Sequence, residues 1–545
     1  MEEEEVEMAV DTLDKPKAAD AAVAAPAKAK GMRPKGVQLF VDWRYVAPGD
    51  NLYMAGGKGM RNWNHAVPGT VAKVDVAHGI RLEAQAGEKV GPLFACDKPW
   101  ESAYMMYVAS LYFDNGKYRM WYGTTPSDHA EGTATWGVDV GLLLCYAESD
   151  DGLTWHKPSL GLIEYQGSTD NNIVFGRDFN HDGYSSGAVF IDETAPATER
   201  YKLFYKGKAK FPDDETYAAK IAELKERFGE GNYDNASFTR SSKDRGIVGM
   251  FGAVSPDGIH WTPLVEPLLL HYSDTLNNVT VDPATGKYVT YMRMRRGGRR
   301  VVGRAETTDF RNWPNLPQIV LEAPLSRHPG DDVYHGVVAK YPPNSDTHLM
   351  FATFFRQLTD GRHVELASSM DGKYWSLLPG DRVVEPGDVD HWTGGDTHIG
   401  QGVVSLPDGR VAVPFVGYTE AHKAPRYLGK PHGAPGLVAW EKDRLSAIVA
   451  DEIGSFSTKE IVFEGSKLNL NAKTTYTGAV TVELRDENGQ PVPGYSFEDS
   501  DVINGNDIAR SASWKGNADI SAFAGKTVSF GFRLRCAKLY AFEFV

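Results

Sequence analysis

Short alternating runs of apolar and polar residues, separated by turn residues, make up most of the chain. Runs such as "GLLLCYAESDDGLTW" and "HVELASSMDGKYW" follow the two-residue period of a half-buried strand, and each run ends at an Asp-Gly pair. Asp and Gly at this position favour a tight turn between two strands. The pattern therefore predicts an all-β protein built from many short hairpins.

One hairpin motif occurs four times: Ser or Thr, any residue, Asp, usually Gly, two more residues and then Trp. The copies are Ser149–Trp155, Ser255–Trp261, Thr307–Trp313 and Ser369–Trp375. A turn is sufficient reason for the Asp and Gly, so we interpret these aspartates as structural rather than catalytic. The tryptophans are 106, 52 and 62 residues apart, and the first interval contains an insertion from Gly207 to Gly246. A unit of roughly 50 to 65 residues remains, which suits a four-stranded propeller blade.

Five copies of the unit's first strand pair can be found, which predicts a five-bladed β-propeller over residues 37–454. The fifth copy lacks the hairpin motif, and we expect the segment Val37–Val46 to supply its outer strand and close the ring. From Ser455 onward the blade pattern stops, and residues 455–545 are predicted to form a separate β-sandwich. Residues 1–36 combine an acidic run with an Ala, Lys and Pro mixture, which predicts a disordered tail.

The insertion contains a helix signal. Asp213 and Asp214 can cap a helix whose apolar stripe ends before Gly229; the stripe consists of Tyr217, Ile221, Leu224 and Phe228. A lid or wall beside a binding site and a purely structural support both fit this pattern.

The charge, the cysteines and the apolar runs of the chain limit the kinds of partner that we expect. The formal net charge of −14 argues against nucleic acid, because phosphate binding needs clustered Lys and Arg, and it suits carbohydrate better. Three widely separated cysteines predict neither a zinc site nor a disulfide framework. No apolar run is long enough for a signal peptide or a membrane span, so the chain as written is expected to be soluble and cytoplasmic, with no membrane partner. A different start codon could add a signal peptide. The oligomeric state is left open.

Acidic residues precede the first strand of every unit. In a propeller the first strands surround the axis, so these side chains are expected to line a central funnel; they are Glu101, Asp182, Asp274, Asp331, Asp332 and Asp396. Cleaving a glycosidic bond takes two carboxyl groups, one protonated and one ionised. We therefore predict catalytic roles for Glu101, Asp182, Asp274 and Asp332, although each of them taken alone also fits a turn or a strand start.

Other side chains near the same axis complete the predicted site. Trp100, Tyr334 and Trp392 offer apolar faces to a sugar ring, and three arginines could bond its hydroxyls or an acidic substituent. The polar candidates for substrate contact are His181, Asn277, Arg293, Arg295, His335, Arg356, Asp396 and His398. Three of these are histidines that could hold a cation, but they lack a fixed short spacing, so no metal or cofactor is predicted.

Several segments carry a family resemblance. "DKPWES", "GKYRMWYG", "SDTLNNVTVDPATGKYVTYMR" and "WKGNADISAFAGKTVSFGFRLRCAKLYAFEF" resemble a poorly characterised group of bacterial proteins whose five-bladed propeller is similar to that of glycoside hydrolase families 32 and 43. The resemblance covers residues 37–545. It implies a nucleophile or base, a residue that tunes pKa values and an acid at Glu101, Asp182 and Asp274, with Asp332 as a substitute for one of them. The Asn-Asp-Pro, Arg-Asp-Pro and Glu-Cys signatures of fructan-cleaving enzymes are missing, so a fructosidase is not supported.

Three functions follow from this sequence. The first is a glycoside hydrolase that acts on a polysaccharide or oligosaccharide through paired carboxylates. The second is a propeller that binds carbohydrate without cleaving it. The third is a sialidase-like enzyme, suggested by the hairpin motif and the arginines, which would need six blades and three convergent arginines.

Overall fold

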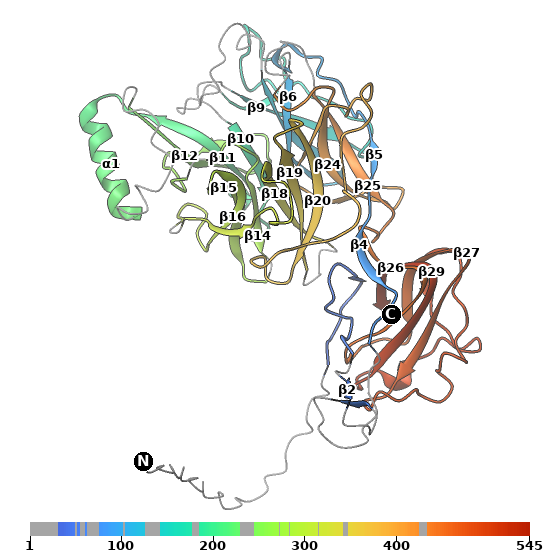
Figure 1. The fold of residues 1–545 in the computed structure, drawn as a ribbon. Coiled ribbons are helices and arrows are strands. Elements are labelled where there is room, and N and C mark those ends of the chain that lie inside the picture. Colours follow the sequence, from blue (N-terminus) through green and yellow to red (C-terminus); the bar gives the residue numbers. More distant parts are fainter. Residues whose placement is uncertain are drawn as a thin grey trace, which may run out of the picture.

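The computed structural model describes residues 31–49, 52–54, 60–62, 76–101, 104–125, 142–176, 185–228, 245–271, 273–282, 284–313, 316–341, 347–423 and 433–545. Strands dominate these ranges, and α1 (Asp214–Phe228) is the one α-helix among them (Figure 1). The prediction of an all-β protein is confirmed in this part of the chain. Within the same ranges, no helix has the length and apolar character that crossing a membrane would require.

Four sheets share one antiparallel order, in which each strand pairs with the next strand along the chain. The first sheet contains β6 (Tyr104–Asp114), β7 (Lys117–Thr125), β8 (Leu143–Ser149) and β9 (Ile173–Phe175). The second contains β10 (Ser185–Ile191), β11 (Tyr201–Lys210), β12 (Gly246–Ser255) and β13 (Thr262–Pro263). The third contains β14 (Asn278–Asp282), β15 (Lys287–Arg296), β16 (Arg299–Thr307) and β17 (Gln318–Leu321). The fourth contains β18 (Asp331–Lys340), β19 (His348–Arg356), β20 (Gly361–Ser369) and β21 (Ser376–Leu377).

The fifth sheet is closed by a strand from the N-terminal part of the chain. Its strands are β22 (Asp396–Ile399), β23 (Val404–Ser405), β24 (Val411–Tyr418), β25 (Gly433–Trp440) and β5 (Glu88–Val90), and β5 pairs with β25. The prediction that Val37–Val46 supplies this outer strand is wrong. Within that segment β1 (Gln38–Leu39) pairs with β29 of the C-terminal sheet, because Phe40 and Tyr45 are buried in the core of that sheet.

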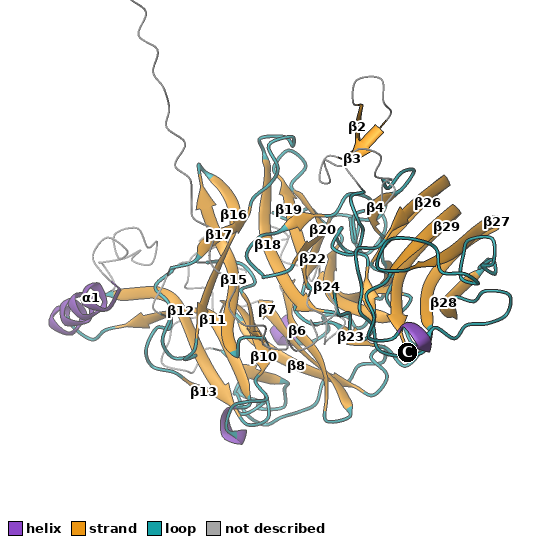
Figure 2. Cartoon of the chain, turned by 90° about the horizontal axis from the view of Figure 1, so that it is seen from below, coloured by secondary structure: helices purple, strands orange, loops and turns teal. Residues whose placement is uncertain are grey.

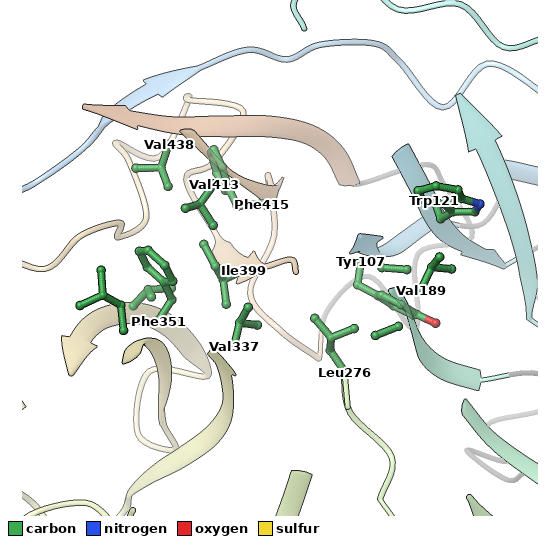
Figure 3. Packing of buried hydrophobic residues seen from close by; sticks show 14 of the residues in the cluster. Tyr107, Trp121, Val189, Leu276, Val337, Phe351, Ile399, Val413, Phe415 and Val438 are labelled. Carbon is green, nitrogen blue, oxygen red and sulfur yellow. The ribbon is translucent and has the colours of Figure 1, made fainter. Parts of the chain in front are cut away.

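The five sheets contact one another in chain order. Strand β6 contacts β10, β10 contacts β14, β14 contacts β18 and β20 contacts β22, while β24 of the fifth sheet returns to β6. The sheets therefore form a closed ring. In the apolar core of the ring, Leu276, Val337 and Ile399 lie close together, and Val189 lies beside Tyr107 (Figure 3).

A glutamine ties the first strands together beside this apolar centre. The Gln401 amide nitrogen donates to the carbonyls of Val189 and Val279 at 3.1 and 3.0 Å and to the Tyr112 hydroxyl at 2.7 Å. Its carbonyl oxygen accepts the Asn278 amide at 2.6 Å. Because buried polar groups must find partners, this network positions the first strands of three sheets relative to one another.

The repeated motif forms turns, as the sequence predicts. The Ser149 hydroxyl accepts the backbone N–H of Gly152 at 2.8 Å, and one carboxylate oxygen of Asp151 accepts the next two backbone N–H groups at 2.8 and 2.7 Å. The same bonds recur in the copies that begin at Ser255 and Ser369. These aspartates are occupied by their own turns and have no part in a central site.

The C-terminal sheet has the order β28-β27-β29-β26-β4, with β1 paired to β29. Its strands are β4 (Arg81–Ala84), β26 (Ser446–Ser457), β27 (Leu468–Arg485), β28 (Asn506–Ser511) and β29 (Ser529–Phe544), and a small hairpin of β2 (Leu52–Met54) and β3 (Met60–Asn62) forms a separate sheet. The C-terminal segment of this sheet thus begins at Ser446, before the predicted boundary at Ser455, and β1 and β4 add two strands from the N-terminal part of the chain. Figure 2 shows it beside the ring, at the end opposite to α1.

Helix α1 begins at the predicted cap, where the Asp213 carboxylate accepts the backbone N–H of Thr216 at 2.7 Å. Its Leu224 side chain is fully buried against Ile247 and Leu270. The predicted end at Gly229 and the Phe228 side chain lie outside the described residues. Figure 1 places the helix at the outer edge of the molecule, beyond β11 and β12, which is the position of a structural support for that hairpin.

Candidate functional site

Glu101 lies in a short 3-10 helix, Pro99–Glu101, between the first and fifth sheets, and is fully buried. One carboxylate oxygen accepts the Tyr122 hydroxyl at 2.7 Å, and the other accepts the Lys157 ammonium at 2.7 Å and the backbone N–H of Asp97 at 3.0 Å. Burial alone would lower the pKa of Lys157, but the carboxylates of Glu101 and Asp97 raise it above its ordinary value. Glu101 is therefore half of a buried ion pair and presents no oxygen to a ligand.

Asp332 and Asp396 are also fully buried, and each binds an arginine of the preceding sheet. The Arg300 guanidinium donates to Asp332 at 2.6 Å. The Nε of Arg362 donates to both Asp396 oxygens at 3.1 and 2.8 Å, and its backbone N–H adds a bond of 2.8 Å. Since Arg300 is on β16 and Arg362 on β20, each pair joins the third strand of one sheet to the first strand of the next.

Sequence reasoning missed these two arginines, although a signal for them exists. Arg300 and Arg362 each precede the Ser or Thr of the hairpin motif, Thr307 and Ser369, by seven residues. Each is also the second residue of the third strand in its sheet. The repeat that located the acids could therefore have located their partners.

Asp274 has a different environment, because 40% of its side chain is exposed. It forms an ion pair with Arg293. Partial burial alone would raise the pKa of Asp274, but Arg293 and then Lys206 outweigh that effect and lower the pKa to about 2. Asp274 is thus ionised at neutral pH, so it can act as a base or nucleophile, whereas the resemblance implied an acid at this position.

Three arginines surround the ring of Tyr334. The guanidinium carbons of Arg293, Arg362 and Arg300 lie 4.2, 4.9 and 5.4 Å from the ring centroid, and the Tyr334 hydroxyl lies 3.1 Å from Nε2 of His422. We refer to Tyr334 and these three arginines as the Tyr334 cluster. The ring is only 7% exposed, so it holds the guanidinium groups in place and has no free face for a sugar.

His335 and His398 stack beside this cluster, with ring centroids 4.4 Å apart. Both are buried, and the Nδ1 atom of each has no hydrogen-bond partner among the residues that the structure describes. Burial is the main reason that the pKa of both histidines is well below the ordinary value; Arg362 lowers the pKa of His335 further, and His335 and then Arg362 lower that of His398. No group of three or more His, Cys, Asp or Glu side chains in the described ranges is spaced to hold a metal ion.

The two neutral histidines predict an acid-sensitive fold. Unfolded histidines bind protons below pH 6.5 while His335 and His398 resist protonation, so stability is fully present above pH 6.5 and falls as the pH falls, by at most about 1.4 kcal/mol per pH unit for each histidine. Urea unfolding at pH 7.5, 6.5 and 5.5 measures this slope. The double variant His335→Gln/His398→Gln should have a flatter slope, whereas His156→Gln, which changes an exposed histidine, should not. Equal slopes for all three proteins would contradict the assignment.

Three other residues predicted for the site are buried or half-buried in the core. Trp100 is 9% exposed and donates to the Asn172 side chain at 2.8 Å within the core between the first and fifth sheets. Asn277 is fully buried, and Trp392 is half-buried against Phe415. His181 and Asp182 lie outside the described residues. The structure therefore brings together Asp274, Asp332, Asp396, Tyr334, Arg293, His335 and His398, and it separates Glu101 and Trp100 from them.

A polar groove that the sequence did not predict lies over the fourth sheet. Its volume of about 520 Å³ is within the range of small-molecule sites. Asp331 and Arg356 form one ion pair in its wall, at 3.3 Å, and Arg327 and Glu365 form another through two bonds of 2.6 Å. Asp331 is next to Asp332 in β18, but alternation along the strand points the two side chains to opposite faces. Its lining residues are Ser326, Arg327, His328, Asp331, Arg356, Glu365, Leu378, Pro379, Gly380, Asp381 and Arg382.

No family model matches the chain, and no curated protein matches it. Similar solved structures include a thermostable family-43 glycoside hydrolase, at 11% identity and a TM-score of 0.38, covering 64% of this chain and 94% of that protein. An endo-arabinase from Bacteroides thetaiotaomicron has 11% identity and a TM-score of 0.37, with 66% of this chain and 100% of that protein covered. The Bombyx mori GH32 beta-fructofuranosidase has 10% identity and a TM-score of 0.39, with 87% and 95% covered. At such identities and TM-scores, no activity is transferred from these proteins to this chain.

Proposed function

We propose that the chain is a glycoside hydrolase built on a five-bladed β-propeller, from β5 to β25, and a β-sandwich that begins at β26. Five antiparallel sheets that contact one another in chain order, with the last returning to the first, support the propeller. Long bent strands around a separate hydrophobic core support the sandwich, with β1 and β4 from the N-terminal part of the chain added to it.

The observation that carries the proposed activity is the Asp274 carboxylate. Glu101, Asp331, Asp332 and Asp396 are all buried and engaged by cations, whereas Asp274 is exposed and stays ionised beside Arg293. Glycosidic cleavage needs such a carboxylate, either as a nucleophile or as a base that activates water. We assign that role to Asp274.

The same chemistry needs a second, protonated carboxyl group to help the leaving oxygen depart. Asp182 precedes the first strand of the second sheet, as Asp274 precedes that of the third, so we propose Asp182 as this acid. Glu101 and Asp332 then have structural roles, since their oxygens are held by Lys157 and Arg300.

The burial of the other ring acids also favours a second function, a propeller that binds carbohydrate without cleaving it. If the acids of the ring serve only as inter-sheet ion pairs, the chain is a carbohydrate-binding propeller without catalysis. A sialidase-like enzyme is not favoured: three arginines converge on Tyr334, but each is already paired with an aspartate, and the described residues contain five ring sheets.

A glycan panel tests the proposal. The purified chain is incubated with neutral and acidic plant and algal polysaccharides and oligosaccharides, and released reducing ends and calorimetric binding are measured on the same samples, with heat-denatured protein as the control. Release of reducing ends supports the hydrolase. Binding without release across the whole panel would contradict the hydrolase and support the binding propeller. If the chain neither binds nor cleaves any glycan, both proposed functions are wrong.

A further inference from the structure

The hairpin of β15 and β16 has the sequence "YMRMRRGGRRVVGR" and presents three arginines on one face. Arg293 and Arg295 are two residues apart on β15, and Arg295 lies directly opposite Arg300 on β16. Alternation along a strand and pairing across it put all three side chains on the same side of the hairpin. This is the side of the Tyr334 cluster, because Arg293 and Arg300 both stack on Tyr334.

The negative charges on this face do not balance the positive ones. Asp274 matches Arg293 and Asp332 matches Arg300. Arg295 is exposed and has no ion-pair partner among the described residues. The pKa of Asp274, which burial alone would raise, is lowered chiefly by Arg293 and to a smaller extent by Arg295, so the Arg295 guanidinium lies within electrostatic reach of that carboxylate.

Arg299 adds positive charge on the opposite face of the hairpin, where it lies across from Arg296. Arg299 follows the hairpin tip and donates at 2.5 Å to the backbone carbonyl of Asp331, a neutral acceptor. Its Nε atom has no hydrogen-bond partner among the described residues. A chain with a formal net charge of −14 thus has unmatched positive charge beside Asp274, and more beside Asp331, which lines the groove.

Resting on the proposed function, we propose that this site takes a glycan that carries an anionic group, a uronate carboxylate or a sulfate ester, and that Arg295 binds that group. A guanidinium suits these groups because its planar donors match paired oxygens, and such charge-assisted bonds are stronger than neutral ones. Asp274 and Asp332 do not repel the anion strongly, because Arg293 and Arg300 already neutralise them. A neutral sugar would leave the Arg295 charge without a partner.

Calorimetry on the full chain tests this assignment with four probes: an oligogalacturonate, a sulfated galacto-oligosaccharide, the same oligosaccharide after desulfation, and a neutral arabino-oligosaccharide. Wild-type protein should bind at least one anionic probe more tightly than the neutral ones, and the preference should weaken in high salt. Arg295→Gln should weaken that binding about tenfold or more and leave neutral probes unchanged. Arg296→Gln is the matched control, because Arg296 is the next residue, lies on the opposite face and pairs with Glu322 at 3.7 Å.

The two anionic probes show which group the site takes. Equal binding of sulfated and desulfated oligosaccharide together with no preference for the oligogalacturonate would overturn the assignment, as would equal losses in Arg295→Gln and Arg296→Gln, or no binding of any probe. Anionic binding without release of reducing ends would remove the hydrolase and leave this inference standing. Cleavage of neutral glycans without a preference for anionic ones would remove this inference and leave the hydrolase.

Discussion

Replacement of Asp274 by asparagine should lower the turnover of a cleaved glycan about a hundredfold to ten-thousandfold. The amide has nearly the same shape as the carboxylate but cannot carry the negative charge that a nucleophile or base needs. Stability should change by less than about 1 kcal/mol, because 40% of the Asp274 side chain is exposed and water screens its pair with Arg293. Initial rates on the best glycan of the panel and urea unfolding of the same preparation measure both effects.

Two further substitutions separate this role from general damage. Asp150→Asn changes an aspartate whose side chain is 85% exposed at a turn, and it should alter neither rate nor stability. Glu101→Gln should lower stability, because Lys157 loses a buried partner, while the folded protein keeps its turnover. Near wild-type turnover in Asp274→Asn would remove Asp274 from the mechanism.

Replacement of Asp396 by alanine should destabilise the fold by about 3 to 5 kcal/mol. The Arg362 side chain is 4% exposed, and without Asp396 its charge stays buried between the fourth and fifth sheets with no carboxylate beside it. Removing one partner of a buried pair is costly because the other remains desolvated. The double variant Arg362→Met/Asp396→Leu should recover part of the loss, since it removes both charges. Urea unfolding at pH 7.5 of the two variants and the wild type measures the difference.

An exposed ion pair provides the comparison for this experiment. Arg382 and Glu385 have side chains 40% and 54% exposed, so Glu385→Ala should cost less than about 1 kcal/mol. If Asp396→Ala proves no more costly than Glu385→Ala, the pair of Asp396 and Arg362 does not stabilise the junction of the two sheets.

The repeated arginine and aspartate pairs suggest why the ring needs acids at its first strands. Each pair spans a junction between consecutive sheets, where the strands themselves share no ladder of backbone hydrogen bonds. A bidentate ion pair sets the orientation of its partners as well as holding them together. Acids near the axis therefore serve assembly at two junctions, and the exposed Asp274 remains for chemistry.

The strands, the repeated turns and the approximate region of the acids follow from local patterns in the sequence. Alternation of apolar and polar residues and the turn bonds of Asp151 involve neighbours a few residues apart, so they can be derived without knowledge of the fold. The repeat also placed Asp274, Asp332 and Asp396 at equivalent positions before or at the first strand of successive sheets.

Local patterns do not show which acids are exposed or which strand completes the fifth sheet, because both depend on contacts between distant segments. The surroundings of Asp332 and Asp396 depend on arginines of another sheet, more than thirty residues earlier in the chain. Both β1 and β5 are short strands that could pair with an open edge, and the choice depends on the distant core that receives Phe40. Local patterns predict that a residue is in a strand, whereas burial and charge pairing arise from contacts between segments far apart in the sequence.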